Sequence, residues 1–264
     1  MKKDRLMENI QFGVCCDPEQ TALYADAGFD FFETAVFSVL CGSDDYLKRI
    51  RDAALPCKCC NGFLPWDLKI TGPEVDRVRV AEYVEKAVSR AAECGIGKIV
   101  FGSGGARRCP EGFPVEKAAE QLLEFVQNAA AVFGRYGVTM VVEPLNLNEC
   151  NVINSVAAGA VLVNRVGLPA VRLLADSYHF YKTDNEPDAL VWSVPLLKHI
   201  HVATNPSRLA PGAEDWDLTG FFSILKHGGY QDLISVETGN WGDDPAAAAA
   251  NAVKILRQTW NGIE

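Results

Sequence analysis

The sequence predicts a single (β/α)8 barrel, a TIM barrel, with residues 1–264 forming one domain. The main observation is a repeat in which an apolar, strand-like run followed by a helix-like stretch occurs eight times, a pattern typical of parallel βαβ units. The strand-like runs lack clean polar–apolar alternation, as expected when both faces of a sheet are covered. No Pro- or Ser-rich linker divides the chain, and 264 residues is an ordinary length for this barrel.

The expected strands and the clearest helices follow in order along the chain. The strands are QFGVCC from Gln11, FDFFETAV from Phe29, PCKCCNGF from Pro56, GKIVFGSG from Gly97, VTMVVEPL from Val138, VRLLADSYH from Val171, KHIHVAT from Lys198 and DLISVET from Asp232. Apolar residues spaced by three and four predict a helix over 116–136. Gly72 and Pro73 are expected to open a helix that runs to Cys94, and Asp244 with Pro245 to cap an alanine-rich final helix.

Composition narrows the classes of partner. A net charge of -9 argues against nucleic acid, whose phosphates are normally bound by clustered Lys and Arg, and it favours a divalent cation. The apolar stretches are too short to span a membrane, and the start MKKDRLMENI lacks the apolar middle of a signal peptide. We therefore expect a cytoplasmic protein, and we read its nine cysteines as reduced thiols.

Four residues of metal-ligand type each close one of the last four expected strands. They are Glu143 in VVEPLN, Asp176 in LLADSYH, His201 in HIHVA and Glu237 in ISVET. Their separations of 33, 25 and 36 residues are each about one βα repeat, so the side chains should meet at the C-terminal mouth of the barrel. Three carboxylates and one imidazole suit a hard or borderline divalent ion. The pattern therefore predicts one metal site.

The segments EPLNLNE, DSYH, HIHVATNPSR followed by APGAEDW, and SVET resemble the xylose isomerase-like TIM barrel superfamily of sugar isomerases and epimerases. Within it, the motifs are most similar to the D-tagatose and D-psicose 3-epimerases. The resemblance covers nearly the whole chain. It implies a Mn2+ ion, with Co2+, Mg2+ or Zn2+ as alternatives, and a homodimer or homotetramer.

The resemblance also implies roles for individual residues. Glu143, Asp176, His201 and Glu237 become the metal ligands, and Glu143 and Glu237 also act as acid and base. His179 and Arg208 would hold the carbonyl and hydroxyl oxygens of a sugar substrate. Glu149 would bind the far end of a ketose.

The chemistry explains why such a set is needed. A proton next to a ketone is weakly acidic, so a metal ion must stabilise the enediolate that forms when the proton leaves. Two carboxylates on opposite faces of the substrate can remove and return that proton, which inverts the carbon. We therefore expect a metal-dependent sugar isomerase or epimerase of carbohydrate metabolism that acts on a small keto sugar.

Other functions stay open at this point. A lyase or dehydratase acting on an inosose or 3-keto-glycoside could use the same metal site. A DNA-repair endonuclease of the same barrel is disfavoured, because it would need more histidines than the four present and a basic surface. A sugar-binding protein without activity would leave the two carboxylates of the acid–base pair idle.

Three further motifs favour structural interpretations. Cys57, Cys59 and Cys60 suggest zinc but lack a second half of the site, so they are read as part of a strand. Glu33 is read as an anchor for a neighbouring loop. The glycine-rich FGSGGARR is read as a turn, although Arg107 and Arg108 keep a phosphate site possible.

One loop departs from the 3-epimerase pattern. Where those enzymes commonly carry Gly-His before Asp-Trp, this chain has Ala213 and Glu214. The segment FYKTDNEP after DSYH also differs from the usual run. Membership of the superfamily is therefore better defined by the sequence than the identity of the sugar.

Overall fold

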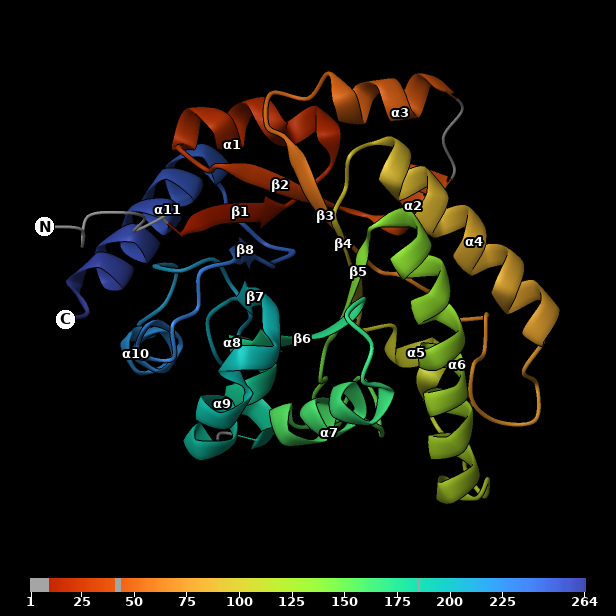
Figure 1. The fold of residues 1–264 in the computed structure, drawn as a ribbon. Helices are drawn as coiled ribbons and strands as arrows, with labels where there is room; N and C mark the ends of the chain where they lie inside the picture. Colours follow the sequence, from red (N-terminus) through yellow and green to blue (C-terminus); the bar gives the residue numbers. More distant parts are fainter. Residues whose placement is uncertain (1–9, 41–43, 185) are drawn as a thin grey trace, which may run out of the picture.

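The eight strands form a closed parallel barrel, as predicted (Figure 1). The computed structural model describes residues 10–40, 44–184 and 186–264. Each strand pairs with its neighbour in sequence, and β1 closes the barrel against β8. The strands are β1 Gln11–Cys15, β2 Phe31–Ala35, β3 Cys57–Asn61, β4 Lys98–Phe101, β5 Thr139–Val142, β6 Val171–Asp176, β7 Leu197–Val202 and β8 Leu233–Val236.

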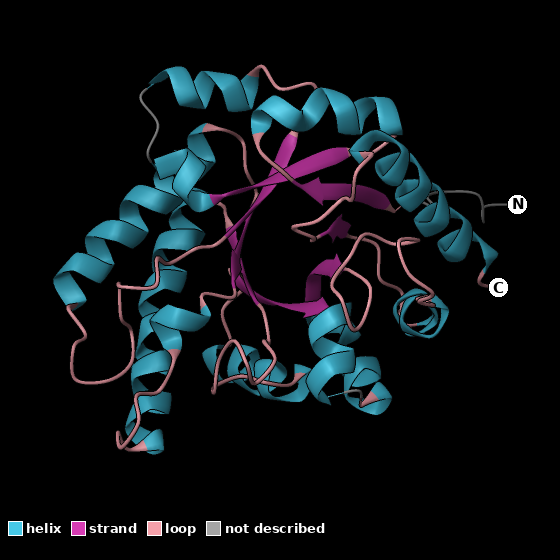
Figure 2. Ribbon diagram, turned by 180° about the vertical axis from the view of Figure 1, so that it is seen from behind, coloured by secondary structure: helices cyan, strands magenta, loops and turns pink. Residues whose placement is uncertain are grey.

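The helices surround the barrel on the outside, so the strands are covered on both faces (Figure 2). In the described residues they are α1 Thr21–Ala27, α2 Val36–Leu40, α3 Asp44–Arg51, α4 Arg77–Glu93, α5 Gly104–Arg107, α6 Val115–Tyr136, α7 Val156–Val166, α8 Ser177–His179, α9 Pro187–Ser193, α10 Thr219–His227 and α11 Pro245–Gly262. Short 3-10 turns lie at Pro18–Gln20 and Val194–Leu196, and a π-helical turn at Phe180–Asp184.

The interior of the barrel is filled by side chains. Phe31, Cys59 and Leu233 form one buried cluster, and Gly13 lies against the ring of Phe31. A Cβ at Gly13 would lie 2.3 Å from that ring, so only glycine leaves room for it. These apolar side chains fill part of the interior beside the buried polar residues Glu33, His199 and Ser235.

Aromatic packing joins the barrel wall to α6. Phe63 meets Phe133 edge-on at 5.5 Å between ring centroids, and Phe101 lies 5.3 Å from Phe125. Phe125 and Phe133 belong to the apolar stripe of α6, whose observed range of Val115–Tyr136 agrees with the predicted helix.

The predicted helix limits are confirmed at the start of α11 and at the end of α4, which has Cys94 as its C-cap, but the predicted start of α4 is wrong. Asp244 accepts a hydrogen bond from Ala247 N at the start of α11, as expected for a cap. The helix expected from Gly72 instead begins at Arg77, because Asp76 is its N-cap and accepts from Val78 N and Arg79 N. A hydrogen-bonding cap thus marks the start more reliably than the earlier proline.

Across the ranges that the structure describes, no helix has both the length and the apolar character needed to cross a bilayer. Residues 1–9, from which we expect that no signal peptide is present, lie outside the described residues.

Candidate active site

The four predicted metal ligands meet at the carboxyl ends of β5 to β8. Glu143 directly follows β5, Asp176 is the last residue of β6, His201 lies near the end of β7, and Glu237 follows β8. One ligand atom from each lies within 4.8 Å of every other. The four residues therefore converge at the barrel mouth, as their spacing in the sequence predicts.

The surroundings of Asp176 fit a bound cation. Its Oδ1 accepts from the backbone N–H of Tyr178 at 2.6 Å, whereas its Oδ2 is buried and has no hydrogen-bond partner among the described residues. A buried oxygen without a donor is costly unless something positive neutralises it. Burial and the nearby charge of Glu237 raise the pKa of Asp176 to about 6. Arg208 Nη2, 3.9 Å from Oδ2, offsets part of this cost, and a divalent ion held by these carboxylates would remove the rest.

The pKa values of the other two carboxyl groups, Glu143 and Glu237, shift in opposite directions. Burial and the charge of Glu237 raise the pKa of Glu143. Burial also raises the pKa of Glu237, but His201 and Arg208 outweigh it and lower that pKa to about 2. The same neighbourhood favours a proton on His201, because Glu33 and Glu237 outweigh its burial and raise its pKa well above the usual value.

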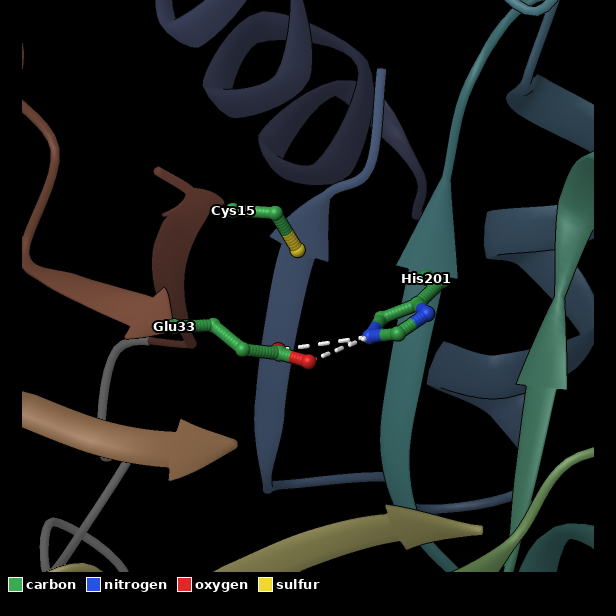
Figure 3. Close-up of side chains that lie close together, drawn as sticks. All are labelled: Cys15, Glu33 and His201. Atoms are coloured by element: carbon green, nitrogen blue, oxygen red, sulfur yellow. Dashed lines mark hydrogen bonds and ion pairs between the residues drawn. The ribbon is translucent and has the colours of Figure 1, made fainter. Parts of the chain in front are cut away.

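His201 presents a defined nitrogen to this group of carboxylates. Its Nδ1 lies 3.3 Å from Glu143 Oε1 and 3.5 Å from Glu237 Oε2. Its Nε2 points the other way, toward Glu33 (Figure 3). The nitrogen available to an ion is therefore Nδ1.

His179 lies beside Asp176 with one nitrogen free. Its Nδ1 lies 3.3 Å from the backbone N of Asn146, which can only donate, so Nδ1 accepts and Nε2 carries the hydrogen. Burial lowers the pKa of His179, which keeps the ring neutral. Its Nε2 is buried and has no hydrogen-bond partner among the described residues, 3.8 Å from Glu149 Oε2. This N–H is placed to donate to a ligand oxygen.

Arg208 forms ion pairs with Glu149, another predicted substrate-binding residue, and with the candidate metal ligand Glu237. Its Nη1 lies 3.2 Å from Glu149 Oε1 and its Nη2 lies 2.5 Å from Glu237 Oε2. Arg208 has a φ of 54°, a left-handed backbone that is unfavourable for a residue other than glycine. Thr238 Oγ1 donates to the carbonyl of Arg208 at 2.9 Å and helps to hold that conformation.

Glu214, where the 3-epimerase pattern has a histidine, ties the loop that carries Arg208. Its carboxylate accepts hydrogen bonds from the Thr204 hydroxyl and from Ser207, at 3.0 Å for Ser207 Oγ. The changed residue therefore acts as a brace within the loop after β7.

Sequence reasoning missed the environment of Glu33. Its fully buried side chain does not anchor a loop, because it points toward the ring of His201 (Figure 3). It accepts hydrogen bonds from His199, His201 and Ser235. A carboxylate in an apolar strand was the available signal, but its partners come from strands more than 160 residues away in the chain.

The structure agrees with the structural interpretation of the glycine-rich segment, because Arg107 has a structural role. Arg107 is fully buried, and its guanidinium donates to the carbonyls of Phe101 and Glu143, at 3.0 and 2.7 Å. It is therefore committed to holding the ends of β4 and β5 together and is not open to a phosphate. In this way Arg107 fixes the backbone that carries Glu143.

The fold and the site define a (β/α)8 barrel with a candidate metal centre at its mouth. The family profile described as xylose isomerase-like TIM barrel matches residues 21–259. The chain therefore belongs to the xylose isomerase-like TIM barrel family, which confirms the resemblance seen in the motifs.

Individual relatives agree with this assignment. The chain is 27% identical over 243 residues to 3-dehydro-D-guloside 4-epimerase of Escherichia coli, covering 88% of this chain and 90% of the relative. It is 30% identical over 203 residues to D-psicose 3-epimerase of Agrobacterium fabrum, covering 71% and 67%. The apo crystal structure of 3-keto-D-glucoside 4-epimerase from E. coli superposes with a TM-score of 0.83 at 23% identity, covering 94% of this chain and 99% of the other.

Proposed function

We propose that the protein is a divalent-metal-dependent epimerase or isomerase of a small, unphosphorylated keto sugar. One observation carries the proposal: three carboxylates and an imidazole converge at the barrel mouth, and one buried carboxylate oxygen, Asp176 Oδ2, has no donor among the described residues. Glu143, Asp176, His201 and Glu237 would hold the ion. We expect Mn2+, with Co2+, Mg2+ or Zn2+ as alternatives, and a homodimer or homotetramer.

Both relatives named above support the reaction class. A D-psicose 3-epimerase and a 3-dehydro-D-guloside 4-epimerase invert a carbon next to a ketone, at position 3 beside the carbonyl of a ketose or at position 4 beside a 3-keto group. The proton on such a carbon becomes removable when the charge that develops on the ketone oxygen is stabilised. A bound divalent ion would supply that stabilisation.

The residues around the candidate metal centre would transfer the protons and hold the substrate. Glu237, whose low pKa keeps it ionised, would remove the proton, and Glu143, whose pKa is raised, would deliver one to the opposite face. The Nε2–H of His179 would donate to a substrate oxygen. Arg208 would exchange part of its ion pair with Glu149 and Glu237 for substrate hydroxyls.

Two features support a substrate without a phosphate group. The net charge is -9, and Arg107, in the only glycine-rich motif that suggested a phosphate site, is occupied by backbone carbonyls. A neutral sugar needs hydrogen-bonding groups, which His179, Arg208 and Glu149 offer.

Product analysis tests the proposal. The Mn2+-loaded protein is incubated with a panel of free ketoses and 3-keto-glycosides, and the products are identified by NMR. We expect an epimer or isomer that keeps the carbon skeleton and every hydroxyl, and no product after EDTA treatment. Loss of water or of an aglycone would instead support the lyase alternative, to which the epimerase relatives lend nothing.

A further inference from the structure

Glu33 contacts the ring nitrogen of His201 that faces away from Glu143 and Glu237, and it lies outside the four-residue group of candidate ligands. It stands on β2 opposite Cys15 of β1, and its side chain is fully buried (Figure 3). His201 of β7 pairs in register with Ser235 of β8. Glu33 therefore reaches across the interior to two strands that are not its neighbours.

Three donors occupy the carboxylate of Glu33. Nε2 of His199 lies 2.7 Å from Oε2, Ser235 Oγ lies 2.9 Å from the same oxygen, and Nε2 of His201 lies 3.1 Å from Oε1. The carboxylate oxygens of Glu33 accept from all three groups, so each of these contacts places a hydrogen on the partner.

The contact with His201 decides which nitrogen faces the ligands. A neutral imidazole has one N–H and one lone pair. If Nε2 carries the hydrogen that Glu33 accepts, the lone pair is on Nδ1, which lies 3.3 Å from Glu143 Oε1 and 3.5 Å from Glu237 Oε2. Such a carboxylate–histidine contact orients a ligand and raises its basicity.

We propose that Glu33 is a positioning residue: it holds His201 in the Nε2–H form so that Nδ1 binds the ion, and His199 and Ser235 hold Glu33 in place. This inference rests on the proposed metal site. Glu33 itself touches neither substrate nor ion.

A competing arrangement would make Glu33 a ligand. Cys15, Glu33 and His201 also bring potential ligand atoms within 4.8 Å of one another. An ion there would have to take Nε2 of His201 and displace the contact with Glu33. Burial and the charge of Glu33 raise the pKa of the Cys15 thiol, which disfavours a thiolate ligand. The two arrangements use different nitrogens of one ring, so they can be told apart.

The first experiment uses the wild-type protein. It is labelled with a nitrogen isotope in histidine and loaded with NMR-active cadmium, and the metal–nitrogen coupling is measured. We expect coupling to a single Nδ1, lost in His201→Ala. Coupling to Nε2 would overturn the inference and leave the metal site standing, whereas no binding by the wild type would overturn both.

The second experiment measures Mn2+ affinity in variants. Glu33→Ala and Glu33→Gln should each bind Mn2+ about 10- to 100-fold more weakly. The glutamine is informative because its amide N–H can face Nε2 and move the ring hydrogen to Nδ1. Affinity equal to wild type in both variants would contradict a positioning role.

Two further variants separate positioning from folding. Asp30→Asn is the matched control, because Asp30 accepts from Phe12 N at 2.8 Å and from Arg257 at 2.9 Å just before β2, away from the centre. It should lower the melting temperature without changing Mn2+ affinity. If Glu33→Ala does not fold, Ser235→Ala is used instead, because it removes one donor to Glu33. We expect Ser235→Ala to bind Mn2+ several-fold more weakly. Unchanged Mn2+ affinity in Ser235→Ala, together with no Nδ1 coupling in the wild type, would overturn the inference.

Discussion

The two carboxylate oxygens of Asp176 have different surroundings, and this difference decides which of them could bind an ion. Its Oδ1 is held by the backbone of α8, so its Oδ2 is fixed in position with no donor among the described residues. Sequence spacing could predict that Asp176 would meet the other three residues, since strands of a barrel end at one face. It could not predict which oxygen is left free, because this depends on the turn that follows β6.

Gly102 lies directly against the carboxylate of Glu143. A Cβ at this position would lie 2.4 Å from Glu143 Oε2, so Gly102→Ala must displace that carboxylate. We expect kcat/KM to fall by roughly 10- to 100-fold with little change in melting temperature, because a misplaced catalytic group costs rate before it costs stability.

Gly97→Ala is the matched control, because a Cβ at Gly97 meets nothing within 4 Å. It should keep wild-type kinetics. If Gly102→Ala also turns over at the wild-type rate, catalysis does not depend on the position of the Glu143 carboxylate.

At the scale of elements, all eight strands could be predicted, because each is a short apolar run covered on both faces. The start of α4 could not be read from Pro73 alone, since the cap at Asp76 sets it. The role of Glu33 was missed for another reason: its partners on β7 and β8 become neighbours only when the barrel closes.

The cap of α4 can be tested directly. Asp76 accepts from Val78 N at 3.1 Å and from Arg79 N at 3.0 Å, so Asp76→Ala leaves both donors unpaired. We expect the free energy of unfolding to fall by about 1 kcal/mol, with activity unchanged. Denaturant unfolding measures the change, and Asp76→Asn should restore most of it. Equal stability of the alanine and wild-type proteins would show that the cap is not used.

At the scale of the whole molecule, the carboxylates couple folding to pH. The pKa of Asp176 is raised from 3.8 to about 6, so the folded, metal-free protein holds this proton more tightly than the unfolded chain. Its contribution to stability is present below pH 3.8 and is lost as the pH rises through about 6. A shift of this size corresponds to about 3 kcal/mol.

We therefore expect metal-free wild type to lose stability relative to metal-free Asp176→Asn between about pH 4 and pH 6.5. Melting temperatures measured across that range check the prediction. Adding Mn2+ to the wild type should reverse the loss, because the ion needs the ionised carboxylate. Parallel curves for the two metal-free proteins would show that Asp176 titrates normally.

The central claim is that Glu143 and Glu237 move a proton on opposite faces of a substrate carbon next to a ketone. The most direct test is turnover of a ketose by the Mn2+-loaded protein in deuterium oxide, with Glu143→Gln and Glu237→Gln alongside. We expect deuterium at the inverted carbon for the wild type and a fall in kcat of about 100-fold or more in each variant. Inversion without deuterium, or turnover that survives both substitutions, would contradict it.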